Sequence, residues 1–246
     1  MIKFDVITIF PKIFDSYLNE SLILRAQKKK FIKINIHNLR DFTNDNHQTV
    51  DDRPFGGGLG MVLKIQPIYD AVESIKSQFT IHNLQTNPKS KILNLKSKVI
   101  LFTPRGKKFT QGMATKLSKM DQIIFICGRY EGVDERVAQK IADMELSIGD
   151  YDLMGGELPA MVCIEAISRL VPGVLGKEAL LTQRITRSGG FIEYAQYTRP
   201  EVFLPMKGKT LRPSSGRQAW RVPKILLSGD HKEIEAWKTA HGKVIE

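Results

Sequence analysis

The sequence predicts an α/β fold in which helices cover both faces of a mostly parallel sheet. Apolar runs of strand length alternate with segments of helical period through the first two thirds of the chain. The 246 residues, 42% of them hydrophobic, are enough to bury a sizeable core. Glycine-rich turns follow several expected strands, at the carboxyl ends where parallel sheets bind ligands.

The elements follow one another in a regular order. In the first half we expect a strand over 3–10, a helix opened by Pro11, a strand over 31–39 with Ile32, Ile34 and Ile36 at period two, and a helix over 67–77, followed by a polar loop over 78–97. In the second half we expect a strand over 98–103, a helix through Met113, Leu117 and Met120, a strand over 122–127, a helix through Val133, Val137 and Ile141, and a helix that begins at Pro159. One face of the 67–77 helix would hold Ile68, Ala71, Val72 and Ile75.

The chain is expected to divide into a main domain over 1–176, a polar linker over 177–196 and a small second domain over 197–246. The clearest element of the second domain is a helix after Asp230, which can cap it. Glu233 is placed to complete a capping box, and Ile234 and Trp237 would form a short apolar face.

The positive charge is concentrated toward the end of the chain. There are 37 Lys and Arg against 26 Asp and Glu, and residues 177–246 contribute +6 to the net charge of +11. The stretch 205–224 has six basic residues, no acid and Trp220, which is typical of a segment that lies on a phosphate backbone. A solvated basic loop is the alternative interpretation.

Several protein classes are disfavoured. The chain has no run of about 18 apolar residues, and its start lacks the features of a signal peptide, so we expect a cytoplasmic protein with no membrane partner. Cys127 and Cys163 both lie in apolar runs, so we expect buried thiols rather than a disulfide framework or a zinc site.

Four loops combine glycine with charged and turn residues: 51–62, 103–111, 127–137 and 147–161. The first is not a phosphate-binding loop, because no Lys-Ser or Lys-Thr follows its glycines. It is not a dinucleotide fingerprint either, because its glycines come after Pro54 and Phe55 rather than directly after an aliphatic strand.

Taken in order, these loops resemble those of the TrmD family, bacterial methyltransferases that modify the N1 nitrogen of guanosine 37 in tRNA. The resemblance includes "GELPAM" (156–161), "PGVLG" (172–176), "QYTRPEV" (196–202) and "VPKILLSGDH" (222–231), and it covers most of residues 1–237. It implies a SPOUT-type parallel sheet with a C-terminal trefoil knot, and a small, mostly helical C-terminal domain. It also implies a homodimer with the active site at the subunit interface, S-adenosylmethionine as methyl donor, and tRNA with guanosine at position 37 as substrate.

The resemblance implies that backbone groups of three loops hold the cofactor, which would require glycine where main chain approaches the ligand. The implied cofactor residues are Thr103, Pro104, Gly128, Glu131, Ser147, Ile148, Gly149, Asp150, Tyr151, Asp152, Leu153, Gly155, Gly156 and Pro159. Glu131 would face the positive end of the ligand. The implied substrate-binding residues are Asp51, Gly57, Gly58, Arg129, Tyr197 and Arg199.

Methylation of guanine N1 requires a base for the N1 proton and a cation for the charge that develops on O6. The resemblance assigns the cation to Arg169, for which an ordinary helical pair with Glu165 is the alternative. The base of the family is a linker aspartate, but the corresponding stretch here, "TQRITRSGGFIE" (182–193), contains none. We favour Glu193 as its replacement, with Glu178 or a group elsewhere as alternatives.

The expected function is therefore N1 methylation of guanosine 37 in tRNA. The rival interpretation is a tRNA-binding homologue with weak or no catalysis, because the linker aspartate is absent. An enzyme acting on another RNA is disfavoured by the resemblance at 51–58 and 196–202. The family also implies magnesium, but the sequence shows no clustered metal ligands; Asp51 and Asp52 are the nearest candidates, and a turn and helix-cap role suits them better.

Overall fold

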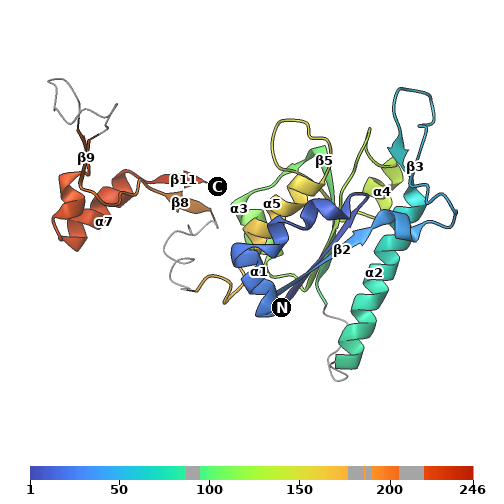
Figure 1. Cartoon of the computed structure of the whole chain (residues 1–246), viewed down its shortest axis with the longest axis horizontal. Helices are drawn as coiled ribbons and strands as arrows, with labels where there is room; N and C mark the ends of the chain where they lie inside the picture. Colours follow the sequence, from blue (N-terminus) through green and yellow to red (C-terminus); the bar gives the residue numbers. More distant parts are fainter. Residues whose placement is uncertain (87–94, 177–185, 187–189, 205–218, 246) are drawn as a thin grey trace, which may run out of the picture. The chain divides into compact units, whose positions relative to one another are not determined.

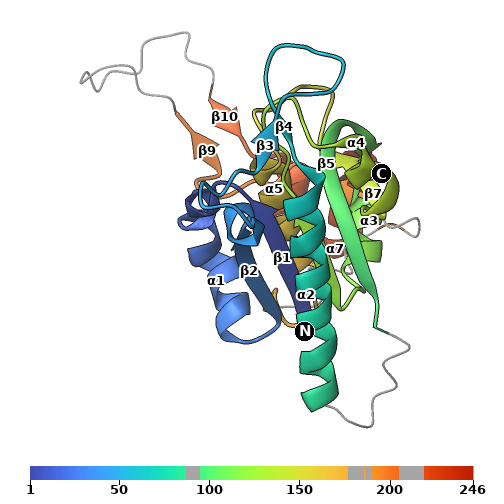
Figure 2. The same ribbon diagram turned by 90° about the vertical axis from the view of Figure 1, so that its right-hand side faces the viewer.

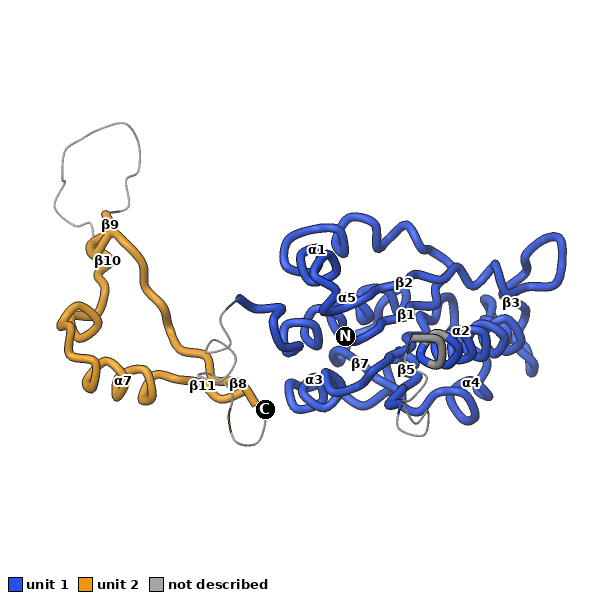
Figure 3. Tube along the Cα trace, turned by 90° about the horizontal axis from the view of Figure 1, so that it is seen from below, with its two compact units in different colours: residues 1–183 blue, residues 184–246 orange. Residues whose placement is uncertain are grey.

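The computed structural model of the chain describes residues 1–86, 95–176, 186, 190–204 and 219–245. The chain divides into two compact units, residues 1–183 and 184–246 (Figure 3). Most of the predicted linker, Glu178 included, lies outside the described residues. The same holds for residues 205–218 of the basic stretch.

Unit 1 is built on a five-stranded parallel sheet with the strand order β2-β1-β6-β5-β7 (Figure 1). Its strands are β1 (Ile2–Thr8), β2 (Ile32–Asn38), β5 (Ser97–Lys108), β6 (Gln122–Ile126) and β7 (Met144–Ser147). A separate antiparallel pair consists of β3 (Asp51–Asp52) and β4 (Val62–Leu63). The predicted α/β class with a central parallel sheet is confirmed.

Helices cover both faces of this sheet. One face packs against α1 (Ser21–Lys28), α3 (Gln111–Leu117) and α5 (Glu157–Ser168), and the other against α2 (Ile65–Thr86) and α4 (Glu135–Lys140). Three short 3₁₀ helices, η1 (Pro11–Phe14), η2 (Tyr17–Asn19) and η3 (Leu39–Phe42), join these elements. Buried Phe4 belongs to the core of the first face and Ile7 to that of the second, because residues an odd number of positions apart on a strand point to opposite faces of the sheet. Within the described part of the chain, no helix is both long and apolar enough to cross a membrane.

Helix α2 is longer than the sequence predicted. The four apolar residues expected on one face are buried, so the helical period was right. However, the helix continues to Thr86, where a polar loop was expected from residue 78. Thr80 Oγ1 donates to Lys76 O at 3.0 Å and Asn83 Nδ2 to Phe79 O at 2.8 Å. The helix therefore continues past the end of its apolar periodicity, with these polar side chains bonded to carbonyls of the preceding turn.

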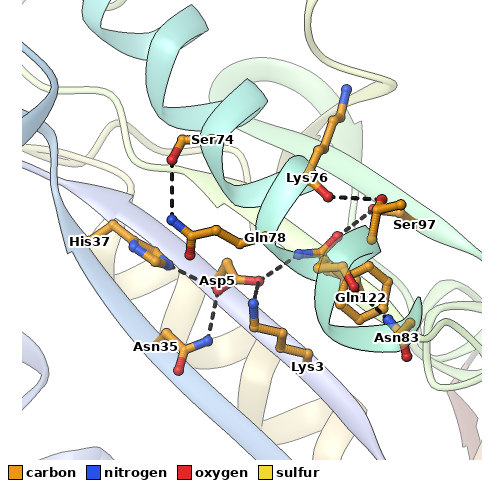
Figure 4. Close-up of polar contacts among 12 residues, drawn as sticks. Lys3, Asp5, Asn35, His37, Ser74, Lys76, Gln78, Asn83, Ser97 and Gln122 are labelled. Carbon is orange, nitrogen blue, oxygen red and sulfur yellow. Dashed lines mark hydrogen bonds and ion pairs between the residues drawn. The ribbon is translucent and has the colours of Figure 1, made fainter. Parts of the chain in front are cut away.

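A buried polar cluster joins three strands beside α2 (Figure 4). Asp5 of β1 is fully buried, and its carboxylate accepts hydrogen bonds from Asn35 Nδ2 and Gln122 Nε2, both at 2.8 Å. The same carboxylate lies 2.9 Å from His37 Nε2 and 3.3 Å from Lys3 Nζ. Burial alone would raise the pKa of Asp5, but the hydrogen bonds and Lys3 together hold that pKa below its ordinary value. The cluster therefore links β1, β2 and β6 through one charged group.

The two cysteines are buried and free, as predicted. Burial raises the pKa of both the Cys127 and the Cys163 thiol, so both remain protonated. Cys127 lies directly after β6 and Cys163 lies within α5, and both belong to the core between that helix and the sheet. They act as small apolar groups.

Unit 2 contains short strands as well as helix. Its described elements are β8 (Phe191–Glu193), β9 (Val202–Phe203), β10 (Trp220–Arg221), the 3₁₀ helix η5 (Lys224–Leu227), α7 (His231–Ala240) and β11 (Lys243–Ile245). Strands β8 and β11 pair antiparallel, as do β9 and β10. As predicted, the Asp230 carboxylate caps α7, accepting from Lys232 N and Glu233 N. In the predicted capping box, the Glu233 side chain would accept a hydrogen bond from the Asp230 N–H. In the structure that N–H donates to Ser228 Oγ instead.

Candidate active site

Strands β5, β6 and β7 end around a cavity of about 550 Å³, called here the first cavity. Its walls come from loops 103–105, 128–133 and 147–156, with Pro159 of α5. Its place at the carboxyl ends of parallel strands is where α/β sheets bind ligands. Its volume falls within the range of small-molecule sites, about 300–1,000 Å³.

The first wall is a loop that interrupts β5. Phe102 and Lys107 both pair with Leu146 of β7, so residues 103–106 leave the strand and return to it. A Cβ on Gly106 would lie 2.6 Å from Leu146 N and C, so only glycine fits at the point of return. Arg105, which also lines the cavity, anchors the loop by donating to Glu145 Oε2 at 3.0 Å and Glu135 Oε2 at 2.6 Å. The sequence indicated this loop but neither Gly106 nor Arg105, because their contacts depend on the register shift.

The second wall, loop 128–133, joins the cavity to the β3–β4 hairpin. Glu131 N donates to Met61 O at 3.1 Å, and Leu63 N donates to Gly132 O at 3.0 Å. Figure 2 shows this hairpin beyond the carboxyl ends of the sheet strands. The hairpin carries three predicted substrate-binding residues, Asp51, Gly57 and Gly58. The structure therefore places these three residues on a segment bonded to the cavity wall.

Arg129 is held at the cavity by a buried carboxylate. Arg129 Nε donates to Glu157 Oε2 at 2.9 Å, and Thr8 Oγ1 donates to Glu157 Oε1 at 2.7 Å. The Phe10 ring lies 4.7 Å from the guanidinium carbon. Glu157 is 1% exposed and begins α5, where the helix dipole favours a negative charge. No local pattern in the sequence indicates a role for Glu157 or Thr8, because their partners are distant in sequence.

Protein groups lie close to the glycines of the third loop, 147–156. A Cβ on Gly155 would lie 2.4 Å from Arg129 Nε, and one on Gly156 would lie 2.6 Å from the Cα of Cys127. A Cβ on Gly149 would lie 2.2 Å from the Tyr151 ring. The family resemblance implies that these glycines allow close approach of a ligand. In the structure, packing of the loops against one another adds a requirement at Gly156, whose nearest neighbour is main chain.

Most predicted cofactor residues line the first cavity. They are Thr103, Pro104, Gly128, Glu131, Ser147, Ile148, Tyr151, Asp152, Leu153, Gly155, Gly156 and Pro159. Two predicted residues are not among its lining. Gly149 lies in a turn in which its carbonyl accepts from Ser147 Oγ at 2.8 Å, and exposed Asp150 pairs with Lys108.

The lining of the first cavity is acidic although the chain is basic. Its charged residues are Arg105, Arg129, Glu131, Glu135, Glu145 and Asp152, which leave an excess of two negative charges. Such a lining favours a cationic ligand. Among the residues that the structure describes, no group of three or more His, Cys, Asp and Glu side chains could hold a metal ion.

Arg169 lies elsewhere, at the C-terminal end of α5. It lines a second cavity of about 650 Å³ together with apolar Ile13, Leu158 and Val162. Glu165 in the same lining accepts a hydrogen bond from Tyr17 Oη at 2.8 Å; burial and this bond raise the pKa of Tyr17 to about 12. Arg169 follows Pro159, which lines the first cavity, by ten positions, or about 15 Å along the helix axis. Within unit 1, the expected catalytic cation and the expected cofactor site are therefore at opposite ends of α5.

The remaining predicted residues belong to unit 2. Glu193 is exposed at the end of β8, opposite Lys243 of β11. The Tyr197 ring meets that of Trp237 edge-on at 6.4 Å, and Arg199 precedes a cis peptide bond to Pro200. Glu178, the alternative base, lies outside the described residues.

Comparison with known proteins identifies the family. A family model described as tRNA (Guanine-1)-methyltransferase TrmD matches residues 2–244. The chain belongs to this family. The resemblance noted in the sequence is thereby confirmed over nearly the whole chain.

Relatives and a solved structure agree with this assignment. The tRNA (guanine-N(1)-)-methyltransferase of Ruminiclostridium cellulolyticum is 45% identical over 96% of this chain and 89% of its own length. That of Clostridioides difficile is 44% identical over 96% of this chain and 90% of its own. The crystal structure of tRNA (m1G37) methyltransferase from Aquifex aeolicus is similar with a TM-score of 0.68 and 38% identity, covering 98% of this chain and 88% of that one.

Proposed function

We propose that this chain is a methyltransferase that uses S-adenosylmethionine to methylate the N1 nitrogen of guanosine 37 in tRNA. The observation that carries the proposal is the family match over residues 2–244, with relatives at 44–45% identity that are named tRNA (guanine-N(1)-)-methyltransferases. The rival interpretation, a binding protein without catalysis, rested on the missing linker aspartate. It has no support from these relatives, which are named as enzymes and match 96% of the chain.

The first cavity fits the cofactor in size and in charge. When bound, S-adenosylmethionine supplies an electrophilic methyl group on a positively charged sulfur. The residues that would hold it are those of loops 103–105, 128–133 and 147–156, which line the cavity. Glu131 and Asp152 contribute to the negative excess that favours a cation there. Magnesium is not part of this proposal.

Two side chains of the protein would act on the guanine. Glu193 accepts the N1 proton, which makes N1 a nucleophile, and such general-base help contributes about 10²- to 10⁴-fold. Arg169 stabilises the negative charge that develops on O6, an effect of about 10²- to 10³-fold for one well-placed donor. Arg129, oriented by Glu157, and the β3–β4 hairpin contact the RNA next to the target base.

A second copy of the chain completes the site. Within unit 1, Arg169 does not line the first cavity. A patch of exposed apolar side chains supports self-association; its members are Phe10 (44%), Ile13 (39%), Tyr17 (44%), Leu158 (55%) and Val162 (45%). Phe10 faces Arg129 at the first cavity, whereas Ile13 and Val162 line the second. Two-fold pairing of this patch would bring Arg169 of one copy toward the first cavity of the other.

The finer features of the fold belong to the same proposal. They are a C-terminal trefoil knot in the main domain, a linker over 177–196 and a small tRNA-binding domain over 197–246. Membership of the family supports the knot that the resemblance implies, and the division into units 1–183 and 184–246 supports a boundary within the linker. Because tRNA is the substrate, we place the enzyme in the cytoplasm.

Methyl transfer to an unmodified tRNA transcript tests the function. With labelled S-adenosylmethionine, we expect one methyl group per transcript that carries guanosine 37, located at N1 by nuclease digestion and mass spectrometry. The matched control is the same transcript with adenosine at position 37, which should accept none. Absence of transfer at every pH up to about 9, with both ligands bound, would contradict the proposal, because a base has its full effect in that range.

A further inference from the structure

The hairpin formed by β9 and β10 in unit 2 presents two aromatic rings on one face. Phe203 and Trp220 are direct partners across the antiparallel pair, so their side chains lie on the same side. Their ring centroids are 5.5 Å apart and their planes are tilted by 37°. Trp220 is 63% exposed and Phe203 47%, and neighbouring Leu204 is 61% exposed.

This exposure is not required by the fold of the hairpin. Each strand has two residues, and the Val222 N–H bonded to Glu201 O at 2.9 Å extends the pairing by main chain alone. Large aromatic side chains in water forgo the burial that normally stabilises a domain. A patch of exposed apolar side chains therefore indicates a contact with a partner.

The charge of the surrounding sequence indicates the kind of partner. In the sequence, residues 205–224 contain six basic residues and no acid; the structure describes two of the six, Arg221 and Lys224, and exposed Arg221 directly follows Trp220. Aromatic rings among basic side chains are the combination that proteins use for unpaired nucleic acid, with bases on the rings and phosphates on the cations. The complementary partner is thus a polyanion with exposed flat apolar groups.

We propose that the Phe203–Trp220 pair is a stacking surface for unpaired bases of the tRNA substrate. This rests on the proposed function, because that function supplies the RNA. Stacking of a base on one aromatic ring typically strengthens binding by about 5- to 150-fold. The surface adds affinity for tRNA without taking part in the methyl transfer itself.

Binding of an unmodified tRNA transcript to Trp220→Ala and Phe203→Ala tests the surface. We expect a dissociation constant at least about tenfold higher for Trp220→Ala, and near wild-type affinity for Trp220→Tyr, which keeps a stacking ring. The slope of log Kd against log salt should be unchanged, because no phosphate contact is removed. Val244→Ala, which shortens a 52% exposed apolar side chain on β11 of the same unit, is the matched control and should bind like wild type.

A fluorescence measurement keeps the test independent of any effect of Trp220→Ala on folding. The chain has two tryptophans, so Trp237→Phe leaves Trp220 as the single reporter. Quenching of its emission by tRNA supports the proposal. Unchanged emission, or equal tRNA affinity of wild type and Trp220→Ala, overturns it, as does quenching by vesicles of phosphatidylglycerol but not by tRNA. Failure of the proposed enzyme function gives a different result. In that case the wild-type protein binds tRNA and shows the quenching but does not methylate guanosine 37.

Discussion

Replacing Gly106 by alanine should damage both the sheet and the first cavity. The added Cβ would lie 2.6 Å from Leu146 N and C and 2.8 Å from Glu145 C, all main-chain atoms of β7. Carbon contacts normally lie at about 3.5–4.0 Å, so β7 would have to move by about 1 Å. Such a movement shifts two paired strands whose loops both line the cavity.

The cost can be estimated from overpacked cores, where an inserted methyl group destabilises by about 1–3 kcal/mol. Because the obstructing atoms are main chain, we expect the upper part of this range, about 2–3 kcal/mol in the free energy of unfolding. For a unit of this size, that lowers Tm by about 4–12 °C. Calorimetric titration should show at least a tenfold loss in affinity for S-adenosylmethionine, because loop 103–106 must shift with the strand.

Gly112→Ala is the matched control for this prediction. Gly112 lies in α3, and a Cβ there would have only Thr110 Oγ1 within 4 Å, at 3.8 Å. Alanine is the better helix former by up to about 1 kcal/mol, so Tm should stay the same or rise. The reasoning would be refuted if Gly106→Ala kept the Tm and the cofactor affinity of the wild type. Equal losses in both variants would refute it as well.

Three further predictions concern buried and titratable carboxylates. Glu157→Gln weakens a charged hydrogen bond to Arg129, so it should lower the free energy of unfolding by about 1.5–3 kcal/mol in urea titrations. An unchanged urea midpoint would show that this pair does not stabilise the fold. Glu193→Gln should slow single-turnover methyl transfer at least about 10²-fold with tRNA and cofactor binding intact, and if only Glu178→Gln slows it, the base is Glu178. The lowered pKa of Asp5 stabilises the fold above the ordinary value of 3.8, and this contribution is lost as pH falls through the folded pKa. The difference in the free energy of unfolding between wild type and Asp5→Asn should therefore have its full value at pH 7 and become smaller in acid. A difference that stays constant with pH would contradict the lowered pKa of Asp5.

The parts of the fold that follow local patterns could be predicted from the sequence. The buried strands, the apolar face of α2 and the Asp230 cap of α7 each depend on neighbouring residues, and the structure contains all three. The length of α2 could not be predicted, because polar side chains that bond to their own helix leave no apolar period. The family resemblance supplied most of the cavity lining, which composition and spacing alone would not have given.

Other features depend on contacts between distant segments. Gly106 is constrained by β7, which enters the sheet some forty residues later, and Glu157 is paired across 28 residues with Arg129. Neither constraint leaves a local pattern in the sequence. The same holds for Arg169, whose position on α5 was expected but whose separation from the first cavity follows only from the three-dimensional fold.

That separation leads to the central claim, that methyl transfer requires the first cavity of one copy and Arg169 of another. The most direct measurement mixes two inactive variants, Arg169→Ala and Gly155→Val, the second of which disrupts the cavity wall at Arg129. After unfolding and refolding together at equal concentrations, half of the dimers carry one intact site, so we expect about a quarter of the wild-type transfer to guanosine 37. Each variant refolded alone should show almost none. No recovery in mixtures shown to contain mixed dimers would contradict the claim and place Arg169 and the cofactor in the same chain.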